Sequence, residues 1–455
     1  MSRASGEQSF RAAPLVVMRR CVSQSMLLAA MLIMMSAACA TRTVSFDKPL
    51  SGPMNAEQRH DLFNRVWSYV ADNYYESSYH GTDWHAVRRR YLPTLDSIAS
   101  DSEMHTLLAA MVGELRDAHS RYFPPADAAA LRSRVSRGIG ATVSEVDGVP
   151  VIETVADNSP AKRAGLEPGM RVTAVNGELI EARYARLLQT EPAASTERAT
   201  RALTWRKTMF GREELMSLTV HQDGFDREVF ARRQAIHSTP AVVATLLPDS
   251  VLYLRFDAFR ASIAAQLRDS LRAYPQARAL VLDMRNNGGG DAAETIRAAG
   301  LFLPHRVSAG EFFSRVTRLN LGFFRIRDGS KPTTGGAPDD DLRPLAILTG
   351  VLTGSGGELL AALLQEERRA TIVGDTTCGC LTAVTKRVPM PGGGMLMISN
   401  RGYKTSRGTI VEGNGVAPDV VVRQTLAELV ARRDNVLDAA RAIVAARATA
   451  SASEQ

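Results

Sequence analysis

The serine at position 355 is a candidate for covalent chemistry. Ser355 begins the segment Ser355-Gly356-Gly357-Glu358, at the predicted start of a helix. A nucleophile needs an exposed hydroxyl and nearby donors for the oxyanion that forms on attack, and a helix N-terminus supplies free backbone N–H groups. The pattern Ser-x-x-Glu is also that of a capping box, in which the two side chains only satisfy the helix start. The motif alone leaves both interpretations open.

A run of glycines is a second candidate. The segment Asp283-Met284-Arg285-Asn286-Asn287 leads from a predicted buried strand into Gly288-Gly289-Gly290. Consecutive glycines can turn main-chain N–H groups toward a ligand, because no Cβ obstructs the approach. The pattern is neither a Walker loop nor a dinucleotide-binding fingerprint. The alternative is an ordinary turn between a strand and a helix.

Candidates for a base and for an acidic partner lie at opposite ends of the chain. His119 follows a predicted helix within Asp117-Ala118-His119-Ser120, where a histidine can also be a simple helix-end residue. Glu412 and Asp419 lie in a glycine-rich bend between residues 411 and 420, a pattern that by itself is typical of a turn. Neither segment identifies its own function.

Helices and strands must position these candidate residues close to one another. Residues 57–120 show apolar residues at helical spacing, and residues 136–233 show the short alternations of a small β-rich module. From residue 250 onward strands alternate with helices, which favours an α/β core. The stretch 328–343 is rich in Gly, Pro and Asp and predicts an exposed loop. The expected core elements are strands at 251–254, 278–282 and 345–348, and helices at 261–271, 292–303, 356–367 and 426–446.

The N-terminal residues are typical of an export signal. Arg19-Arg20 precedes an apolar run from Met26 to Ala38 that ends in small residues. The run is too short to span a bilayer, which takes about 20 apolar residues. Ordinary cleavage at Ala38-Cys39-Ala40 and lipidation of Cys39 both stay open, and a buried N-terminal helix is the alternative to export.

Composition excludes several other classes of protein. The 455 residues carry a formal charge of +7, but this charge is scattered and forms no basic stripe with interleaved aromatic residues, so we expect no nucleic acid as partner. Outside the presumed signal only Cys378 and Cys380 remain, too few for a disulfide scaffold and a poor zinc signature. We interpret them as small residues in a tight turn, with a redox-sensing pair or a second nucleophile as the alternative.

The order of these motifs resembles that of the C-terminal processing, or tail-specific, serine peptidase family. The resemblance covers roughly residues 57–424, and the β-rich module within it resembles a PDZ domain. It implies a crotonase-like (ClpP/crotonase) α/β peptidase core with an N-terminal helical region and an inserted PDZ domain. It also implies cleavage at or near the C-terminal part of protein substrates, without a metal or cofactor.

One segment departs from the best-known members of that family. They use a Ser–Lys dyad with the lysine in a Thr-Phe-Gly-Lys-Gly segment, whereas the matching stretch here is Thr377-Cys378-Gly379-Cys380. The next lysine, Lys386, lies six strand residues further on, about 20 Å away. A serine hydroxyl needs a base, and histidine has a suitable pKa. The chain is similar in this respect to the branch that includes the tricorn core protease, which lacks the lysine and uses a histidine base.

The resemblance therefore implies specific roles. Ser355 would be the nucleophile, His119 the general base and Glu412 an orienting or water-holding carboxylate, with the role of Ser120 left open. The implied oxyanion donors are the main-chain N–H groups of Gly288, Gly289 and Gly356. The implied carboxylate loop for peptide binding consists of Gly138, Ile139 and Gly140, since a glycine-flanked loop beside an open strand edge can capture a chain terminus.

We expect an exported serine endopeptidase for protein or peptide substrates, periplasmic or anchored to a membrane through a lipidated Cys39. Its oligomeric state is not predicted. The alternatives are a non-catalytic peptide-binding protein of the same fold and a crotonase-fold enzyme that acts on a thioester. The expected regions are a signal peptide at 1–40, a helical region at 41–130, a PDZ-like domain at 136–233, a peptidase core at 240–447 and a disordered tail at 448–455.

Overall fold

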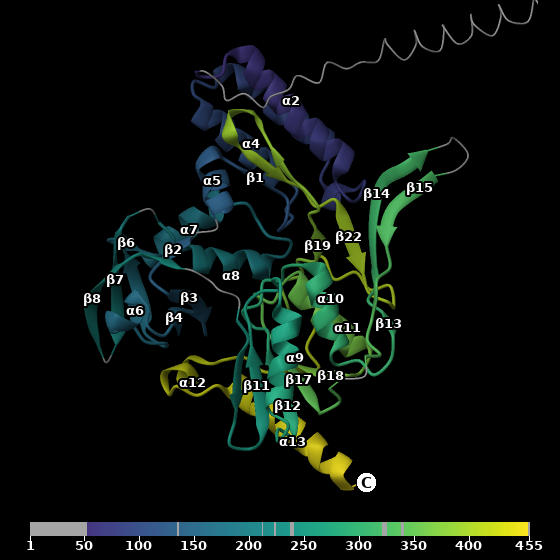
Figure 1. Cartoon of the computed structure of the whole chain (residues 1–455). Helices are drawn as coiled ribbons and strands as arrows, with labels where there is room; N and C mark the ends of the chain where they lie inside the picture. Colours follow the sequence, from purple (N-terminus) through teal and green to yellow (C-terminus); the bar gives the residue numbers. More distant parts are fainter. Residues whose placement is uncertain are drawn as a thin grey trace, which may run out of the picture. The chain divides into compact units, whose positions relative to one another are not determined.

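The computed structural model describes residues 52–133, 136–211, 213–222, 224–236, 241–320, 325–337 and 341–453 (Figure 1). The predicted signal peptide and Cys39 lie outside these ranges. The described residues all belong to one unit, which runs from Leu50 to Gln455. Within them, no helix is long and apolar enough to cross a membrane.

A six-stranded sheet forms the α/β core that the sequence predicts. Its order is β10-β11-β12-β17-β18-β23, in which β10 is antiparallel to β11 and all other neighbours are parallel. The strands are β10 (Val243–Leu246), β11 (Val251–Arg255), β12 (Ala279–Asp283), β17 (Leu345–Thr349), β18 (Ala370–Gly374) and β23 (Val420–Val421).

Helices cover both faces of this sheet, because its central strands β12, β17 and β18 are mostly apolar and are buried at every position. Along β12, Leu280 and Leu282 pack with α9, α10 and α11, whereas Ala279 and Val281 pack with α13. Successive strand residues point to opposite faces, so an uninterrupted apolar strand must be covered twice. The helices are α9 (Ile263–Ala273), α10 (Ala292–Gly300), α11 (Gly356–Glu366) and α13 (Asn435–Ser453).

The topology of this sheet positions two of the candidate motifs. Because β12 and β17 are adjacent and parallel, their carboxyl ends lie at the same edge of the sheet. The glycine run follows β12 and Ser355 follows β17, so both must lie at that edge, where open α/β sheets place their sites.

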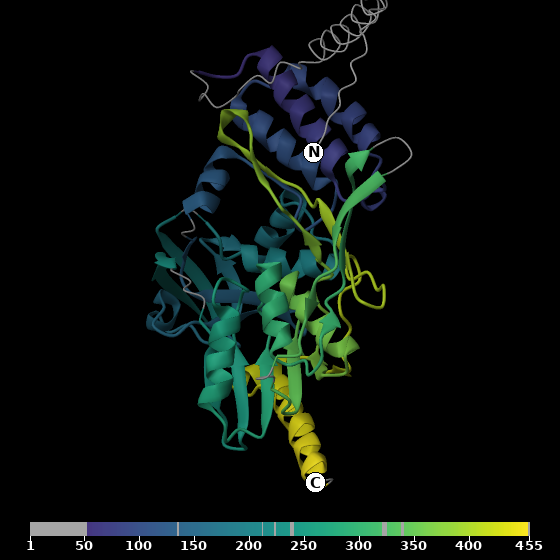
Figure 2. The same ribbon diagram turned by 45° about the vertical axis from the view of Figure 1, so that its right-hand side comes forward.

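The helical N-terminal region has its own core. Leu62, Phe63 and Leu108 pack there with Met390 and Leu396 of a distant hairpin, which is yellow-green in Figures 1 and 2 and lies against the purple helices. Strand β1 pairs with β21 of that hairpin. The elements are α2 (Ala56–Asn73), η1 (Tyr79–Gly81), α3 (Trp84–Tyr91), η2 (Leu92–Ser97), α4 (Asp101–Gly113), β1 (Arg121–Phe123), α5 (Pro125–Ser133), β20 (Arg387–Pro389), η3 (Pro391–Gly393) and β21 (Met395–Met397).

The β-rich module is a separate sheet with two helices of 11 residues each. Its strand order is β3-β4-β5-β7-β8, so β3 is an edge strand, and α8 packs beside it. The elements are β2 (Ser136–Gly138), β3 (Ala141–Val146), β4 (Val149–Val155), α6 (Pro160–Arg163), β5 (Arg171–Val175), β6 (Glu178–Leu179), α7 (Ile180–Thr190), α8 (Glu197–Lys207), β7 (Leu215–Gln222), β8 (Phe225–Arg232) and β9 (Gln234–Ile236).

Three predictions about the C-terminal half differ from the structure. The helix predicted over 426–446 is two helices, α12 (Leu426–Val430) and α13, separated by the charged residues Arg432, Arg433 and Asp434. The tail predicted as disordered from 448 is helical as far as Ser453, because its alanines favour the helix. The predicted loop 328–343 also contains strand residues. The remaining strands are β13 (Val307–Ser308), β14 (Glu311–Asn320), β15 (Arg325–Ser330), β16 (Thr333–Thr334), β19 (Thr382–Ala383) and β22 (Arg401–Lys404).

Candidate active site

Ser355 occupies a strained backbone position directly before α11. Its φ and ψ are 49° and −115°, a region that residues with a Cβ rarely adopt. A serine that only caps a helix has extended angles, as Ser159 has before α6, with φ −82° and ψ 160°. A capping role alone therefore does not account for the conformation of Ser355, and strain of this kind is concentrated at functional sites.

The buried carboxylate of Glu358 holds the start of α11 in place through several hydrogen bonds. It accepts hydrogen bonds from the N–H groups of Ser355 (2.9 Å), Gly379 (2.6 Å) and Cys380 (2.9 Å), and from the hydroxyl of Thr377 (2.6 Å). Burial raises the pKa of Glu358, although these donors oppose the shift. Glu358 thus forms its half of the predicted capping box and also ties Ser355 to the turn at residues 377–380.

The glycine run lies directly against Ser355. A Cβ on Gly289, whose φ is +94°, would stand 2.6 Å from the Ser355 Cβ and 2.6 Å from the Gly356 nitrogen. The carbonyl of Gly289 accepts the N–H of Phe259 at 2.8 Å, which holds the loop in this position. Glycine is required here for two independent reasons, a positive φ and the close approach to the helix start.

The three predicted oxyanion donors differ in their availability. The N–H of Gly289 donates to Asn287 Oδ1 at 2.9 Å, so it is engaged within the loop. For the N–H groups of Gly288 and Gly356 no acceptor is found in the part of the chain that the structure describes. The expectation for Gly289 is corrected on this point: in this conformation Gly288 and Gly356 offer free N–H groups beside Ser355, and Gly289 does not.

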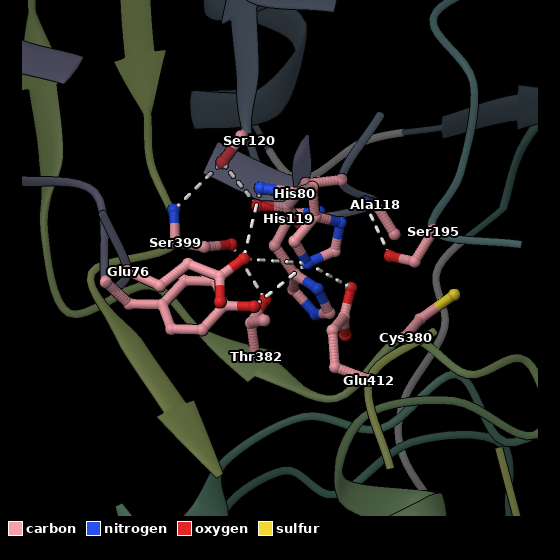
Figure 3. Close-up of polar contacts among 12 residues, drawn as sticks. Glu76, His80, Ala118, His119, Ser120, Ser195, Cys380, Thr382, Ser399 and Glu412 are labelled. Carbon is pink, nitrogen blue, oxygen red and sulfur yellow. Dashed lines mark hydrogen bonds and ion pairs between the residues drawn. The ribbon is translucent and has the colours of Figure 1, made fainter. Parts of the chain in front are cut away.

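His119 lies in the loop between α4 and β1, and a short polar turn fixes its main chain. Asp117 accepts the His119 N–H at 2.8 Å and the Ser120 hydroxyl at 2.6 Å. The N–H of Ser399 donates to Ser120 Oγ at 3.0 Å, which joins this turn to the segment after β21 (Figure 3). Ser120 therefore holds the histidine loop in place.

The imidazole of His119 is buried and incompletely paired. Its Nδ1 has no hydrogen-bond partner among the residues described. Burial lowers the pKa of His119, and Arg121 acts in the same direction, while the attraction of Asp117 opposes both. Burial by itself would raise the pKa of Asp117, but His119 and the Ser120 hydroxyl hold it below its usual value. A neutral imidazole next to an ionised carboxylate is suited to accepting a proton.

Glu412 is also buried, and its neighbour differs from the predicted one. Neither carboxylate oxygen has a hydrogen-bond partner in the described ranges. Burial, followed by the nearby Asp117, raises the pKa of Glu412 to about 9, and the Ser195 hydroxyl opposes this shift. The nearest basic group is His80, whose Nε2 lies 3.8 Å from Oε1. No ion pair or hydrogen bond between Glu412 and His119 occurs among the described side chains.

The three predicted catalytic residues converge on one turn without bonding to one another. The Ser355 N–H donates to the Cys380 carbonyl at 3.2 Å, and the Gly413 N–H, next to Glu412, donates to the Gly379 carbonyl at 2.9 Å. Ala118, next to His119, packs on Cys378 and Cys380. Within the described chain, no hydrogen bond joins the Ser355 hydroxyl to the His119 ring. The turn brings the segments together, and the side chains are not yet in contact.

The two cysteines of this turn are joined by a disulfide. Cys378 and Cys380 are only 6% and 3% exposed, and their Cα atoms lie 5.2 Å apart. The predicted tight turn is present, whereas the bond between the two residues was not predicted. Lys386 is exposed, so the structure offers no support for it as a substitute for the family's lysine.

The predicted peptide loop of the β-rich module has unpaired donors as well. Gly140 has a φ of +80°, and a Cβ there would stand 2.4 Å from the Ser159 Cβ. The carbonyls of Ile139 and Gly140 accept the N–H groups of Ala161 and Ala156, at 2.9 and 2.8 Å. Their own N–H groups have no acceptor within the described residues. The loop leads directly into the edge strand β3.

Three residues of the site were not predicted. His80 contacts Glu412, Ser195 Oγ accepts the N–H of Ala118 at 3.1 Å, and Arg198 Nε donates to the Thr377 carbonyl at 2.8 Å. Each of them stands in a segment without a catalytic pattern, and only long-range packing brings it to the site. No group of His, Cys, Asp and Glu side chains suited to a metal ion occurs in the ranges described.

Three stretches of the chain match known protein families. Residues 250–422 match peptidase family S41, residues 55–113 match the tricorn protease C1 domain, and residues 151–200 match the PDZ domain. The order of these matches is that of the helical region, the β-rich module and the α/β core.

The similar curated proteins are processing proteases. The chain is 26% identical over 387 residues to the carboxyl-terminal-processing protease of Picosynechococcus sp., covering 83% of this chain and 86% of the relative. It is 25% identical over 399 residues to the chloroplastic carboxyl-terminal-processing peptidase 2 of Arabidopsis thaliana, covering 83% and 71%. Its homologues are thus C-terminal-processing proteases with a PDZ domain, which does not favour the non-catalytic alternative.

Solved structures share the fold. The photosystem II D1 C-terminal processing protease superposes with a TM-score of 0.55 at 23% identity, covering 80% of this chain and 93% of that chain. Mature CPAF superposes with a TM-score of 0.61 at 14% identity, covering 82% and 94%. The chain has the S41 peptidase fold, with mixed α/β architecture and a PDZ domain.

Proposed function

We propose that this homologue of C-terminal-processing proteases is an exported serine endopeptidase that cleaves protein substrates at or near their C-terminal region, with Ser355 as the nucleophile. The observation that carries the proposal is the strained φ of Ser355 at a helix start, with two free N–H groups beside it. This arrangement is what an attacking hydroxyl and a developing oxyanion need. The core around it is of the crotonase-like type.

In each step of the proposed reaction, His119 takes up or releases one proton. His119 takes the Ser355 hydroxyl proton as the oxygen attacks the scissile carbonyl carbon, and the negative charge falls on the carbonyl oxygen near the N–H groups of Gly288 and Gly356. As the C–N bond breaks, His119 gives its proton to the leaving amine, and a water molecule then hydrolyses the ester by the reverse roles. Glu412 orients His119 or holds that water. Binding of substrate draws Ser355 and His119 together, because catalytic hydrogen bonds often tighten only in the complex.

We also propose that a histidine replaces the lysine that serves as the base in other members of the family. Cys380 occupies the place of the family's lysine, and its sulfur is bonded to Cys378. His119 is the buried neutral base that lies near the same turn. We propose on this basis that the chain resembles the branch of the family that uses a histidine.

The PDZ domain supplies recognition of chain ends. The free N–H groups of Ile139 and Gly140 support binding of a terminal carboxylate, and the edge strand β3 supports pairing with the residues that precede it. The substrate would then be held by its end while an upstream segment enters the site.

Export is part of the proposal. The disulfide between Cys378 and Cys380 fits an oxidising compartment such as a bacterial periplasm. The charged and apolar N-terminal segment supplies the signal, with Cys39 as the residue that a lipid would modify.

The test uses the mature chain and an unstructured peptide with an apolar C-terminus. The wild-type protein should cleave the peptide and react with a serine-directed acylating probe. Ser355→Ala should lose both activities, and His119→Ala should lose cleavage. Full cleavage by His119→Ala would disprove the base assignment, and an unreactive Ser355 in the folded wild-type protein would favour a non-catalytic peptide binder.

A further inference from the structure

His80 is a histidine that none of the proposed catalytic steps uses. It lies in the short turn η1, where Tyr79 and His80 have φ values of 47° and 56°. Two consecutive residues with a Cβ in the left-handed region must be held there by their surroundings. The backbone at His80 is therefore held in place by its surroundings.

Three oxygen atoms lie close to one ring nitrogen of His80, Nε2. Tyr75 Oη lies 2.9 Å from Nε2, and carboxylate oxygens of Glu76 and Glu412 each lie 3.8 Å from it. The main-chain N–H of His80 also donates to Glu76 at 3.1 Å. Figure 3 shows the ring of His80 between Glu76 and Glu412. His80 is thus fixed by its own segment and directed at a residue more than 300 positions away.

Glu412 is a buried acidic side chain at this site for which no hydrogen-bond donor is found among the described residues. Its side chain is 3% exposed, and its two oxygens accept no hydrogen bond in the described structure. Buried polar groups are nearly always paired, and an unpaired buried charge is strongly unfavourable. Asp117 and Glu358 disfavour the ionised form of Glu412, whereas the Ser195 hydroxyl and the Leu381 N–H favour it. The phenol groups of Tyr74 and Tyr75 also interact with this carboxyl group. His80 is the neighbour among these that can carry a positive charge.

We infer that His80 is a positioning residue for Glu412: its ring, with Nε2 3.8 Å from Oε1, holds the buried carboxyl group at the site. The ionised carboxylate can then stabilise the imidazolium that forms on His119. This inference rests on the proposed function, in which Glu412 assists His119.

The kinetic test compares His80→Phe, which removes the ring nitrogens at similar volume, with the wild-type enzyme. We expect kcat to fall about tenfold while KM changes less than about twofold, because substrate contacts are untouched. His80→Gln, which cannot be charged, should behave like His80→Phe. The matched control is His85→Phe, an exposed ring on α3 that should change neither value.

A second readout does not depend on catalysis. Urea unfolding of the wild-type protein, His80→Phe, Glu412→Gln and the double variant forms a double-mutant cycle. The lower urea midpoint expected for His80→Phe should disappear in the Glu412→Gln background, because the carboxyl group that His80 contacts is gone. Equal midpoint losses in both backgrounds would overturn the inference. If the wild-type protein cleaves no peptide, the proposed function fails, and this cycle still decides whether His80 and Glu412 are coupled.

Discussion

The buried, half-unpaired imidazole of His119 makes the acid side of the pH profile informative. Burial lowers its pKa, so the ring stays neutral, and able to accept a proton, to lower pH than an exposed histidine. We predict that kcat/KM falls on the acid side with a midpoint below the ordinary histidine pKa of 6.5. The measurement is kcat/KM against pH with a peptide that does not titrate in this range. A midpoint above the ordinary value would contradict this assignment of the base.

A second prediction at the residue scale concerns how the buried carboxyl group of Glu412 lowers the free energy of unfolding as the pH rises. Its pKa is about 9 in the folded chain against 4.5 as the ordinary value. Between these values the folded state keeps a proton that the unfolded state has lost, so stability falls as pH rises through this window. Glu412→Gln removes the titration and should be more stable than the wild-type protein near pH 7.5, by on the order of 4 kcal/mol.

Urea unfolding at two pH values checks this sign. Near pH 4 both folded and unfolded wild-type chains hold the proton, so the advantage of Glu412→Gln should vanish there. The same variant should lose peptidase activity, which separates stability from function. An advantage of equal size at pH 4 and pH 7.5 would show that packing, and not ionisation, is the cause.

At the scale of elements, the loop after β12 and the start of α11 form a single unit whose geometry depends on one glycine. Gly289→Ala would place a Cβ 2.6 Å from Gly356 N and 2.6 Å from Ser355 Cβ, at a positive φ. We expect activity to fall at least about a hundredfold, and stability to fall by about 1–3 kcal/mol from backbone strain. The comparison is Gly288→Ala, where no atom lies within 4 Å of the added carbon. Similar losses in both variants would contradict the steric argument.

The disulfide turn is the second such unit. Cys378→Ser with Cys380→Ser opens a short loop, and chain entropy predicts a loss of about 1–2 kcal/mol. Because the Cys380 carbonyl binds the Ser355 N–H and the Gly379 carbonyl binds the Gly413 N–H, we also expect kcat to fall severalfold. Thermal unfolding and kcat under oxidising and reducing conditions test this. A wild-type protein that is insensitive to reduction, despite full reduction of the bond, would contradict it.

The sequence predicts some of these units because they are local. The apolar strands 278–282 and 345–348 and their following motifs indicate a parallel sheet, and parallel neighbours bring the glycine run and Ser355 to one edge. The positions of His119 and Glu412 depend instead on pairing across most of the chain, such as β1 with β21. No local pattern encodes the 3.8 Å approach of His80 to Glu412, and so it could not be predicted.

At the scale of the whole molecule, the PDZ domain contacts the peptidase site through the start of α8. Thr196 Oγ donates to the Cys378 carbonyl at 2.6 Å, and Arg198 donates to the carbonyls of Thr377 (2.8 Å) and Asn414 (2.5 Å). Ser195 receives the Ala118 N–H. One helix start thus reaches the segments that carry Ser355, Glu412 and His119. A peptide bound beside α8 could therefore influence the site mechanically.

This coupling predicts a separation of binding from turnover. Arg198→Ala removes the contacts to Thr377 and Asn414 but none within the PDZ sheet, so kcat should fall about tenfold, as expected for the loss of charged hydrogen bonds. Affinity of the Ser355→Ala background for a chain-end peptide should be unchanged. Arg201→Ala is the control, because Arg201 pairs with Glu145 inside the domain. Equal loss of kcat in both variants would mean that α8 affects the site only as part of the PDZ domain. The contacts of Arg198 with Thr377 and Asn414 would then not couple the two.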